Sequence, residues 1–208
     1  GFIGPNGAGK STTIKLIMNL LSKDGGEIKI LGLDNIKHEK EVKNRIGFVF
    51  DENYFYEELT VAEMKAVIAP FYKNWSDDAF NRYIKEFSLP PRSKIKELSK
   101  GMKMKFSIAV ALSHDAELLI MDEPTSGLDP IIRSELLDIL TYILQDENKS
   151  VFFSTHITSD IEKIADYVTF INNGTIVFSS SKDEVIDRHG LVKGPREMLS
   201  SEVRKYFI

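Results

Sequence analysis

A glycine-rich loop that ends in a lysine and a serine lies near the start of the chain. Residues 4–11 read GPNGAGKS and match the pattern G-x-x-x-x-G-K-[ST]. The glycines let successive backbone N–H groups point at phosphate oxygens, and the start of the following helix adds positive charge at the same place. Lys10 would reach the β- and γ-phosphates of a nucleotide, Ser11 would ligate Mg²⁺, and Thr12 would add a second hydroxyl. The pattern therefore predicts a nucleotide-phosphate site that also includes Asn6, Gly7, Ala8 and Gly9.

Two adjacent carboxylates follow a short apolar run in the second half of the chain. Leu118–Met121 read as a buried strand, and Asp122 and Glu123 come directly after it. A carboxylate at the carboxyl end of such a strand faces the crevice where ligands bind in open α/β sheets. An isolated Asp-Glu pair is usually a solvated turn, but hydrolysis of a nucleotide bound at the loop needs both groups. We therefore expect Asp122 to hold Mg²⁺, directly or through water, and Glu123 to accept a proton from the attacking water.

Strands and helices alternate around these two segments. Gly1–Gly4 read as the end of a buried strand, and the apolar spacing of Thr12–Leu21 predicts a helix. Glu27–Leu31 alternate as a strand does, and Ile46–Phe50 read as a second buried strand. The phosphate loop is thus placed after a strand and before a helix, which is the context that this motif requires.

Residues 60–113 carry a helical pattern throughout. Thr60 and Glu63 are spaced as a capping box at the start of the first helix. An aromatic stripe at helical spacing, more often core than cofactor site, is formed by Phe80, Tyr83, Ile84 and Phe87. We expect this segment to be an all-helical subdomain inserted into an ATPase core made of residues 1–59 and 114–208.

A second alternating block follows the helical segment. Asp129-Pro130 fits a helix cap followed by proline, Val151–Phe153 read as a strand, and Asn173-Gly174 mark a β-hairpin. A further helix would be lined by Ile157, Ile161 and Ile164. The predicted fold is α/β, a P-loop NTPase with a mostly parallel central sheet covered by helices, the inserted helical subdomain, and an antiparallel hairpin near the C-terminal part.

Composition limits the classes of protein and of chemistry. The 208 residues contain 27 Lys and Arg against 31 Asp and Glu, a net charge of −4, so no global charge favours nucleic acid. Without cysteine, disulfides, zinc thiolates and thiol nucleophiles are excluded. No apolar run approaches the roughly 20 residues that span a bilayer. Because the chain begins within a strand and ends on three bulky apolar residues, we expect a piece of a longer protein, truncated at the N-terminus; a complete chain with a short first strand is the alternative.

Four further segments give a resemblance to one family, the ATP-binding subunits of ABC transporters. Residues 98–102 (LSKGM) resemble the family's signature, usually LSGGQ, and residues 126–129 (SGLD) resemble its D-loop. His156 matches the switch histidine, and Asp51, after Val49-Phe50, occupies the place of the Q-loop. The segments follow the family's order and cover about residues 1–180.

The resemblance implies roles for residues outside the phosphate loop. In the family, the signature of one subunit binds the ATP held by the second subunit of a head-to-tail dimer, which would involve Ser99 and Gly101. His156 would contact the γ-phosphate and orient the water, Asp129 would make a contact across the dimer, and Asp51 would be a metal ligand. Ordinary alternatives stay open, because Ser99 and Asp129 also suit helix caps and His156 also suits a surface position.

Two segments depart from the family pattern. Asp51 stands where the family usually has glutamine, which is one methylene longer and uncharged, so the reach of this loop is in question. Lys100 and Met102 replace a glycine and a glutamine of the signature. Lys100 either brings charge to the partner's phosphates or, as we favour, points its charge to water. The family's adenine-stacking aromatic lies upstream of the residue that matches Gly1.

The resemblance implies the motor subunit of an ABC membrane transporter, which binds ATP and Mg²⁺ and hydrolyses ATP. Its partners would be integral-membrane permease subunits and a second ATP-binding subunit, with no nucleic acid, and it would be cytoplasmic and peripheral on the inner face of the membrane. Residues 71–75 (FYKNW) are similar to bacterial exporters of drugs or peptides. Tyr54-Phe55-Tyr56 would either contact a permease or pack within the loop. The alternative is a non-transport ABC ATPase that acts on ribosomes or in DNA repair, although such proteins usually carry two cassettes or a long coiled coil.

Overall fold

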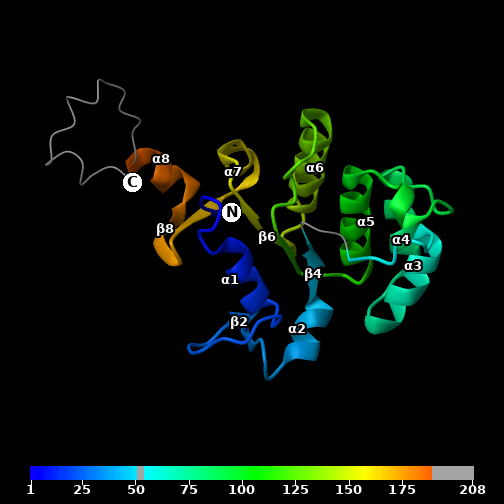
Figure 1. Ribbon diagram of the computed structural model, residues 1–208, viewed down its shortest axis with the longest axis horizontal. Coiled ribbons are helices and arrows are strands. Elements are labelled where there is room, and N and C mark those ends of the chain that lie inside the picture. The colour runs from blue at the N-terminus through cyan, green and yellow to red at the C-terminus, as the bar shows by residue number, and fades with distance from the viewer. Residues whose placement is uncertain (51–53, 189–208) are drawn as a thin grey trace, which may run out of the picture.

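A six-stranded sheet forms the centre of the molecule (Figure 1). The computed structural model describes residues 1–50 and 54–188. The strand order is β4-β5-β6-β1-β7-β8, and every pair is parallel except β7–β8. The strands in this order are Ile46–Val49, Leu118–Met121, Ser150–Thr155, Phe2–Ile3, Tyr167–Asn172 and Thr175–Ser181. The predicted parallel sheet with an antiparallel hairpin is therefore confirmed.

Helices follow the strands on both sides of this sheet. In chain order the α-helices are α1 (Lys10–Ile17), α2 (Glu39–Arg45), α3 (Val61–Ile68), α4 (Asp77–Glu86), α5 (Lys100–Ser113), α6 (Pro130–Ile143), α7 (Thr158–Ile164) and α8 (Lys182–Arg188). Short 3₁₀ turns lie at Ala69–Phe71 and Ile95–Glu97. Within the described residues, no helix is long and apolar enough to cross a membrane.

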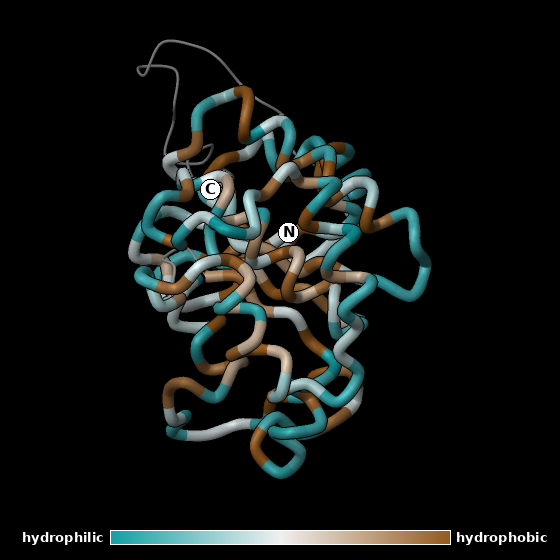
Figure 2. The backbone as a smooth tube through the Cα atoms, turned by 90° about the vertical axis from the view of Figure 1, so that its right-hand side faces the viewer, coloured by the Kyte–Doolittle hydropathy of each residue, from teal (hydrophilic) through white to brown (hydrophobic). Residues whose placement is uncertain are grey.

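Alternate side chains of the buried strands point to two different layers of helices. Leu119 and Phe153 belong to the larger hydrophobic cluster, which includes residues of α3 to α7. Ile120 faces the other way and joins the smaller cluster with Ile14 of α1 and Val42 of α2. The sheet is therefore the middle of three layers, as expected for strands buried on both faces. Figure 2 shows the hydrophobic segments gathered in the middle of the molecule.

The helix after the phosphate loop is shorter than predicted. It begins at Lys10 and ends at Ile17, whereas the sequence pattern placed it over Thr12–Leu21. Asn19 adopts the left-handed backbone conformation (φ +56°), and the Leu20 N–H donates to the Lys15 carbonyl at 2.8 Å. This arrangement ends a helix, so Leu20 and its neighbour lie outside it and are exposed.

The predicted strand over Glu27–Leu31 is reduced to the two residues of β2, Lys29–Ile30. β2 pairs with β3 (Leu33–Asp34) in a separate antiparallel ribbon. The ribbon turns through Leu31 and Gly32, which both have positive φ. Helix α2 was not predicted, because its seven residues bury only Val42 and therefore show no apolar stripe.

Residues 60–113 contain α3, α4, α5 and the two 3₁₀ turns, joined by segments that are not helical. The Thr60 Oγ1 accepts the Glu63 N–H at 3.2 Å, and the Glu63 carboxylate accepts the Thr60 N–H at 2.8 Å, which completes the expected capping box. Phe80, Ile84 and Phe87 of the aromatic stripe are buried and Tyr83 is half-buried, and Phe80 lies 6.2 Å from Phe106 of α5 between ring centroids. The hydrophobic cluster continues from these helices into the sheet. The stripe is therefore core, as expected.

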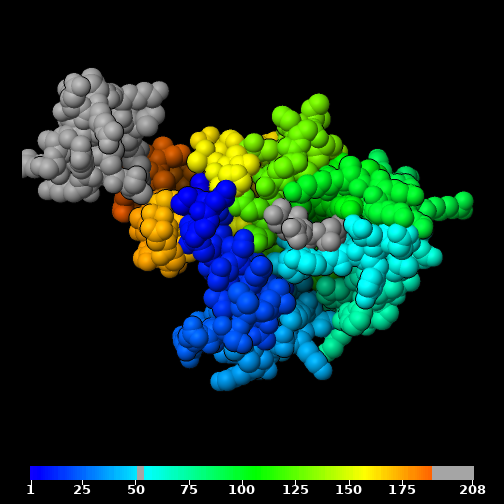
Figure 3. Space-filling view, in the orientation of Figure 1, coloured from blue at the N-terminus to red at the C-terminus, as the bar shows by residue number. Residues whose placement is uncertain are grey.

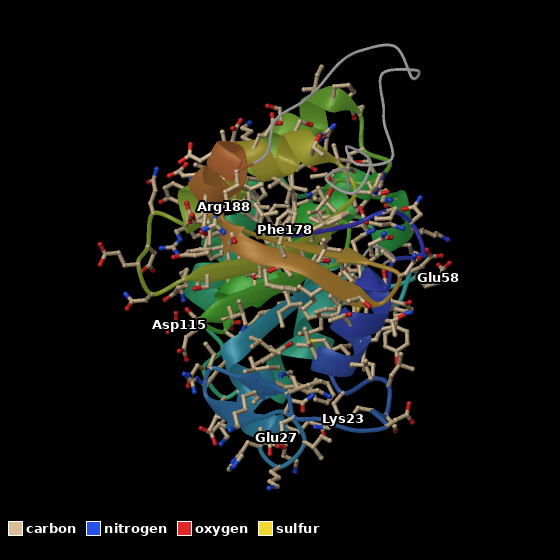
Figure 4. All side chains as sticks on the ribbon, turned by 90° about the vertical axis from the view of Figure 1, so that its left-hand side faces the viewer. Lys23, Glu27, Glu58, Asp115, Phe178 and Arg188 are labelled. Carbon is tan, nitrogen blue, oxygen red and sulfur yellow. The ribbon has the colours of Figure 1, made fainter. Side chains whose placement is uncertain are left out.

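The hairpin β7–β8 and helix α8 lie at the edge of the sheet opposite to β4 (Figure 4). Asn173 and Gly174 form its turn with φ of +47° and +74°, as the Asn-Gly pair predicts. Phe178 of β8 packs against Phe170 of β7 at 5.7 Å. Figure 4 shows Phe178 on the hairpin and Arg188 on α8 at the same edge.

Candidate nucleotide-binding and catalytic site

The phosphate loop joins β1 to α1 through backbone that only glycine adopts readily. Gly7 and Gly9 have φ of +80° and +108°. Gly9 caps α1, and no side chain among the described residues caps the N–H groups of the first turn of that helix. Those N–H groups are therefore available to an anion. The Gly174 N–H donates to the Ala8 carbonyl at 2.9 Å, so the hairpin braces the loop.

Lys10 lies inside the loop rather than in solvent. Its side chain is 5% exposed, and Nζ donates to the Gly4 carbonyl at 2.8 Å and to the Pro5 carbonyl at 3.2 Å. The same Nζ lies 3.1 Å from Glu123 Oε1. The structure thus brings together two predicted site residues that are far apart in the sequence.

The two carboxylates after β5 point to different partners. Asp122 is buried, and its Oδ1 accepts a hydrogen bond from the Ser154 hydroxyl at 2.6 Å. Glu123 is 12% exposed, and its backbone is left-handed with φ +47°. Oε2 of Glu123 lies 2.8 Å from His156 Nδ1. Glu123 therefore lies between Lys10 and His156, with one oxygen toward each.

A cavity of about 460 Å³ lies over these residues. Its lining consists of Asn6, Gly7, Gly9, Lys10, Ser11, Thr12, Glu123, Ser126 and His156. Ala8 is buried behind the loop, and Asp122 lies behind Glu123 without lining the cavity. A larger cleft of about 560 Å³ lies between α4 and α6, away from the phosphate loop. The smaller cavity is the candidate site, because its donors and acids converge. Figure 3 shows the first residues, in blue, directly beside α7, in yellow.

The donor set fits a magnesium ion that is shared with a nucleotide. Ser11 offers an exposed hydroxyl, and Asp122 offers a carboxylate whose Oδ2 accepts no hydrogen bond from a described residue. Hard oxygen ligands of this kind suit Mg²⁺, which usually takes one or two protein ligands together with phosphates and waters. The described part of the chain holds no cluster of three or more acids and histidines that would bind a metal without a nucleotide.

The signature residues Ser99 and Gly101 lie outside this cavity. Ser99 is exposed and caps α5, and its Oγ accepts the Met102 N–H at 3.2 Å. Gly101 is buried where a β-carbon would collide with Ile132 of α6. The cap and the close approach of α5 to α6 are therefore structural roles of these two residues. Lys100 Nζ lies close to Gly127 of the same chain, 3.3 Å from where a β-carbon would be.

Asp129 caps α6, and its Oδ1 accepts the N–H groups of Ile131 and Ile132, each at 3.1 Å. Asp129 therefore has the helix-capping role that the sequence left open as the alternative to a contact across the dimer. Asp51, the predicted metal ligand of the Q-loop, lies outside the described residues.

The sequence left open whether Tyr54, Phe55 and Tyr56 contact a partner or pack within the loop, and the structure gives different answers for the three residues. Phe55 packs on Phe106 at 4.8 Å between ring centroids, which is loop packing. Tyr54 contacts Phe50 at 4.7 Å and is 68% exposed, and Tyr56 is 66% exposed. The two tyrosines are therefore accessible to a partner.

Sequence reasoning missed residues that bond to the predicted site from behind. Ser154 contacts both acids: it donates to Asp122 and accepts the Glu123 N–H at 3.0 Å. Ser154 stands two residues before His156 on a strand, and the period-two alternation of strands was the available signal. A second set of hydrogen bonds holds the segment that follows Glu123. Asp160 accepts one from the Thr125 hydroxyl at 2.5 Å and one from Arg133 Nε at 2.8 Å.

Comparison with known protein families and relatives agrees with the geometry. Residues 1–126 match the family described as "ABC transporter", and residues 94–159 match the description "AAA domain, putative AbiEii toxin, Type IV TA system". The chain is 37% identical over 179 residues to the bacitracin transport ATP-binding protein BcrA of Bacillus licheniformis, covering 85% of this chain and 58% of BcrA. It is 34% identical over 195 residues to the linearmycin resistance ATP-binding protein LnrL of Bacillus subtilis (strain 168), covering 91% of this chain and 62% of LnrL. The chain thus spans roughly three fifths of these two relatives.

Solved structures share the fold. One is described as the ATP-binding subunit of an ABC transporter, and it matches with a TM-score of 0.80 and 31% identity over 98% of this chain and 86% of that chain. A dimeric post-hydrolysis ATP-binding cassette, bound to ADP and Pi, matches with a TM-score of 0.75 and 22% identity over 86% of this chain and 83% of that chain. The predicted P-loop α/β fold is therefore confirmed.

Proposed function

The chain belongs to the ABC transporter family of ATP-binding proteins, and on that premise we propose that it is the ATP-hydrolysing motor subunit of a membrane transporter. The observation that supports this most is the convergence of Lys10, Glu123 and His156 at one cavity. A cation for the phosphates, a base for the water and a group that orients the base are what nucleotide hydrolysis requires.

Binding of ATP would change the partners of Lys10 first. In the structure, the Lys10 ammonium lies 3.1 Å from Glu123 and neutralises its carboxylate. The β- and γ-phosphates compete for this cation, and the uncapped N–H groups of α1 take the remaining phosphate oxygens. Glu123 is thereby released from Lys10 while His156 still holds its second oxygen. When bound, Mg²⁺ would neutralise charge on the phosphate oxygens, with Ser11 and Asp122 holding it.

Hydrolysis follows from the released carboxylate. Glu123 accepts a proton from a water as the water oxygen attacks the γ-phosphorus, and the bond to the bridging oxygen of ADP breaks. His156 is 40% exposed and lies 2.8 Å from Glu123, so it would fix the direction of that carboxylate and contact the γ-phosphate. The products are ADP and inorganic phosphate.

We assign the signature to a second subunit's nucleotide. Ser99 is exposed and lies outside the cavity of its own chain, so its α5 N-terminus is available to the ATP of a head-to-tail partner. Gly101 would allow a close approach of backbone to phosphate, and Asp129 would contact the partner across the dimer. Asp51 would be a further metal ligand.

Transport also requires a path through the membrane. We propose that integral-membrane permease subunits contact the exposed Tyr54 and Tyr56 and that the inserted segment 60–113 moves relative to the core, residues 1–59 and 114–208, as ATP binds. The protein would then be cytoplasmic and peripheral on the inner face of the membrane. Relatives named for bacitracin transport and linearmycin resistance support export as the direction. The net charge of −4 gives no support to nucleic acid as a partner.

Substitution of Glu123 tests the proposed chemistry. Glu123→Gln keeps the size of the side chain but removes the proton acceptor, so phosphate release should fall by at least about 100-fold while ATP still binds. Glu162→Gln is the matched control, because Glu162 is an exposed carboxylate on α7. Phosphate release and binding of a fluorescent ATP analogue are measured on the same preparations. Parent-like turnover in Glu123→Gln would assign the base to another residue.

A further inference from the structure

One buried hydroxyl connects the two acids of the proposed site. Ser154 lies near the end of β6, beside the end of β5, and is 0% exposed. Its Oγ donates to Asp122 Oδ1 at 2.6 Å and accepts the Glu123 N–H at 3.0 Å. A single side-chain atom therefore touches the predicted metal ligand and the backbone of the predicted base.

The direction of the hydroxyl proton follows from these two bonds. Because the Glu123 N–H donates into a lone pair of the Ser154 oxygen, the hydroxyl proton is directed to Asp122. The two hydrogen bonds point in the same direction, from the Glu123 N–H to Ser154 and from Ser154 to Asp122, and both are shielded from water, so each strengthens the other. Asp122 Oδ1 is thus satisfied by the protein, and Oδ2 accepts no bond from the described residues. This fixes which oxygen of Asp122 is left for an ion.

The same hydroxyl supports an unusual backbone conformation at Glu123. Its φ of +47° lies in the left-handed region, which residues with a β-carbon rarely adopt. Ser154 holds the N–H side of this residue, and the Ser126 N–H donates to its carbonyl at 3.1 Å. Held in this conformation, the Glu123 carboxylate reaches both Lys10 and His156.

Ser113 provides the comparison for an ordinary buried serine. It is 1% exposed, and its hydroxyl donates to the Ala109 carbonyl one turn earlier in its own helix. Such a bond only satisfies the hydroxyl. Ser154 is as deeply buried, but its partners belong to another strand end and both are predicted site residues.

We propose that Ser154 is a positioning residue that sets the Asp122 carboxylate for Mg²⁺ and the Glu123 carboxylate for proton transfer. This inference rests on the proposed ATPase function and deepens it. Loss of the hydroxyl would leave the phosphate loop intact, so binding of the nucleotide without metal should not depend on Ser154. Binding of Mg²⁺ with the nucleotide, and turnover, should depend on it.

The test compares Ser154→Ala, Ser154→Thr and Ser113→Ala in the whole 208-residue chain. A fluorescent ATP analogue is titrated in EDTA and then at rising Mg²⁺, and kcat and KM are measured separately. Ser154→Ala should bind the analogue in EDTA within about twofold of the parent. Its half-saturating Mg²⁺ concentration should rise, and its kcat should fall, by about 10- to 100-fold. Ser154→Thr should restore both values, and Ser113→Ala should leave both unchanged.

Several outcomes would overturn the inference. A Ser154→Ala protein with the parent's Mg²⁺ dependence and kcat would reduce Ser154 to a core hydroxyl. If thermal unfolding shows that Ser154→Ala is not folded, Ser154→Cys fills the site with a side chain that forms only weak hydrogen bonds, and a parent-like Mg²⁺ dependence in that variant would refute the role equally. Failure of the parent itself to bind ATP would instead refute the proposed function.

Discussion

Lys10 is held in place by the phosphate loop and by Glu123. Its ammonium is buried, and it is held by two loop carbonyls and by Glu123. A buried cation with these partners is already placed for phosphate, because the loop carbonyls stay with it when the carboxylate leaves. Charge-assisted bonds of this kind are stronger than neutral ones.

Loss of the Lys10 charge should therefore remove most of the affinity for ATP. Lys10→Ala is expected to weaken binding by at least about tenfold, equivalent to about 1.4 kcal/mol, and to abolish turnover. Lys15→Ala, an exposed lysine on the same helix, should change neither. Equilibrium titration with a fluorescent ATP analogue checks both variants. Undiminished turnover in Lys10→Ala would contradict the assignment of the phosphate loop.

At the scale of residues, sequence reasoning found the groups but not their contacts. The glycines and Lys10 follow from a local pattern, and Glu123 follows from its place after a buried strand. The pair between Lys10 and Glu123, and the bonds of Ser154 to both acids, depend on which strands are neighbours in the sheet. That order is not encoded in any local spacing, so these contacts could not be predicted.

At the scale of elements, an ion pair joins α6, which follows Glu123 in the chain, to α7, which follows His156. Asp160 of α7 is 0% exposed, Arg133 of α6 donates to it from Nε at 2.8 Å, and the Nη2 of Arg133 lies 2.6 Å from the same carboxylate oxygen. Thr125, two residues after Glu123, donates to the other oxygen of Asp160. The segment from the acids to α6 is thereby fastened to the helix that follows His156.

Removal of one partner of this pair should be costly, because it leaves a buried charge behind. Arg133→Met is expected to lower the free energy of unfolding by about 3–5 kcal/mol. Arg188→Met, which removes a solvent-exposed pair with Glu184, should cost at most about 0.5 kcal/mol. Urea unfolding monitored by circular dichroism gives both values. Equal values for the two variants would contradict the bracing role of the buried pair.

Elements with strong apolar periodicity were predictable, and weak ones were not. β5 lies at Leu118–Met121, as the four apolar residues predict. The end of α1 was misplaced because Leu20 and Leu21 continue an apolar pattern after the backbone has turned at Asn19. α2 was missed because its surface is almost wholly polar. For α1 the backbone turn at Asn19 decided the boundary, and for α2 the sequence offered no apolar stripe to detect.

At the scale of the whole molecule, a buried histidine lies where the helical segment meets the rest of the chain. His114 follows α5 and is 1% exposed, and its ring stacks on Tyr72 at 3.8 Å between centroids. The pKa of His114 is lowered from 6.5 to about 4, mainly by burial and to a smaller extent by the Lys149 ammonium, while the backbone of Asn44 and of His114 itself and the Asp115 carboxylate oppose the shift. His114 is therefore neutral in the folded protein at neutral pH.

This shift makes stability depend on pH in a known direction. Below pH 6.5 the unfolded chain binds a proton at His114 that the folded protein does not bind until about pH 4. Stability is therefore lost as the pH falls from 6.5 to 4, by about 3 kcal/mol for this group. His114→Phe keeps the stacking and removes the titration, so its stability relative to the parent should improve by that amount between pH 7 and pH 4. A difference that is constant with pH in urea unfolding would contradict this.

The central claim is that ATP bound at the Lys10–Glu123 site joins two copies of the chain through Ser99. Light scattering of Glu123→Gln tests it most directly, because bound ATP is not consumed. With saturating Mg²⁺ and ATP the mass should rise from 23.6 kDa to about twice that value, but not with ADP. Ser99→Arg in the same background should bind ATP and stay monomeric. A mass that stays at 23.6 kDa while ATP is bound would contradict the claim.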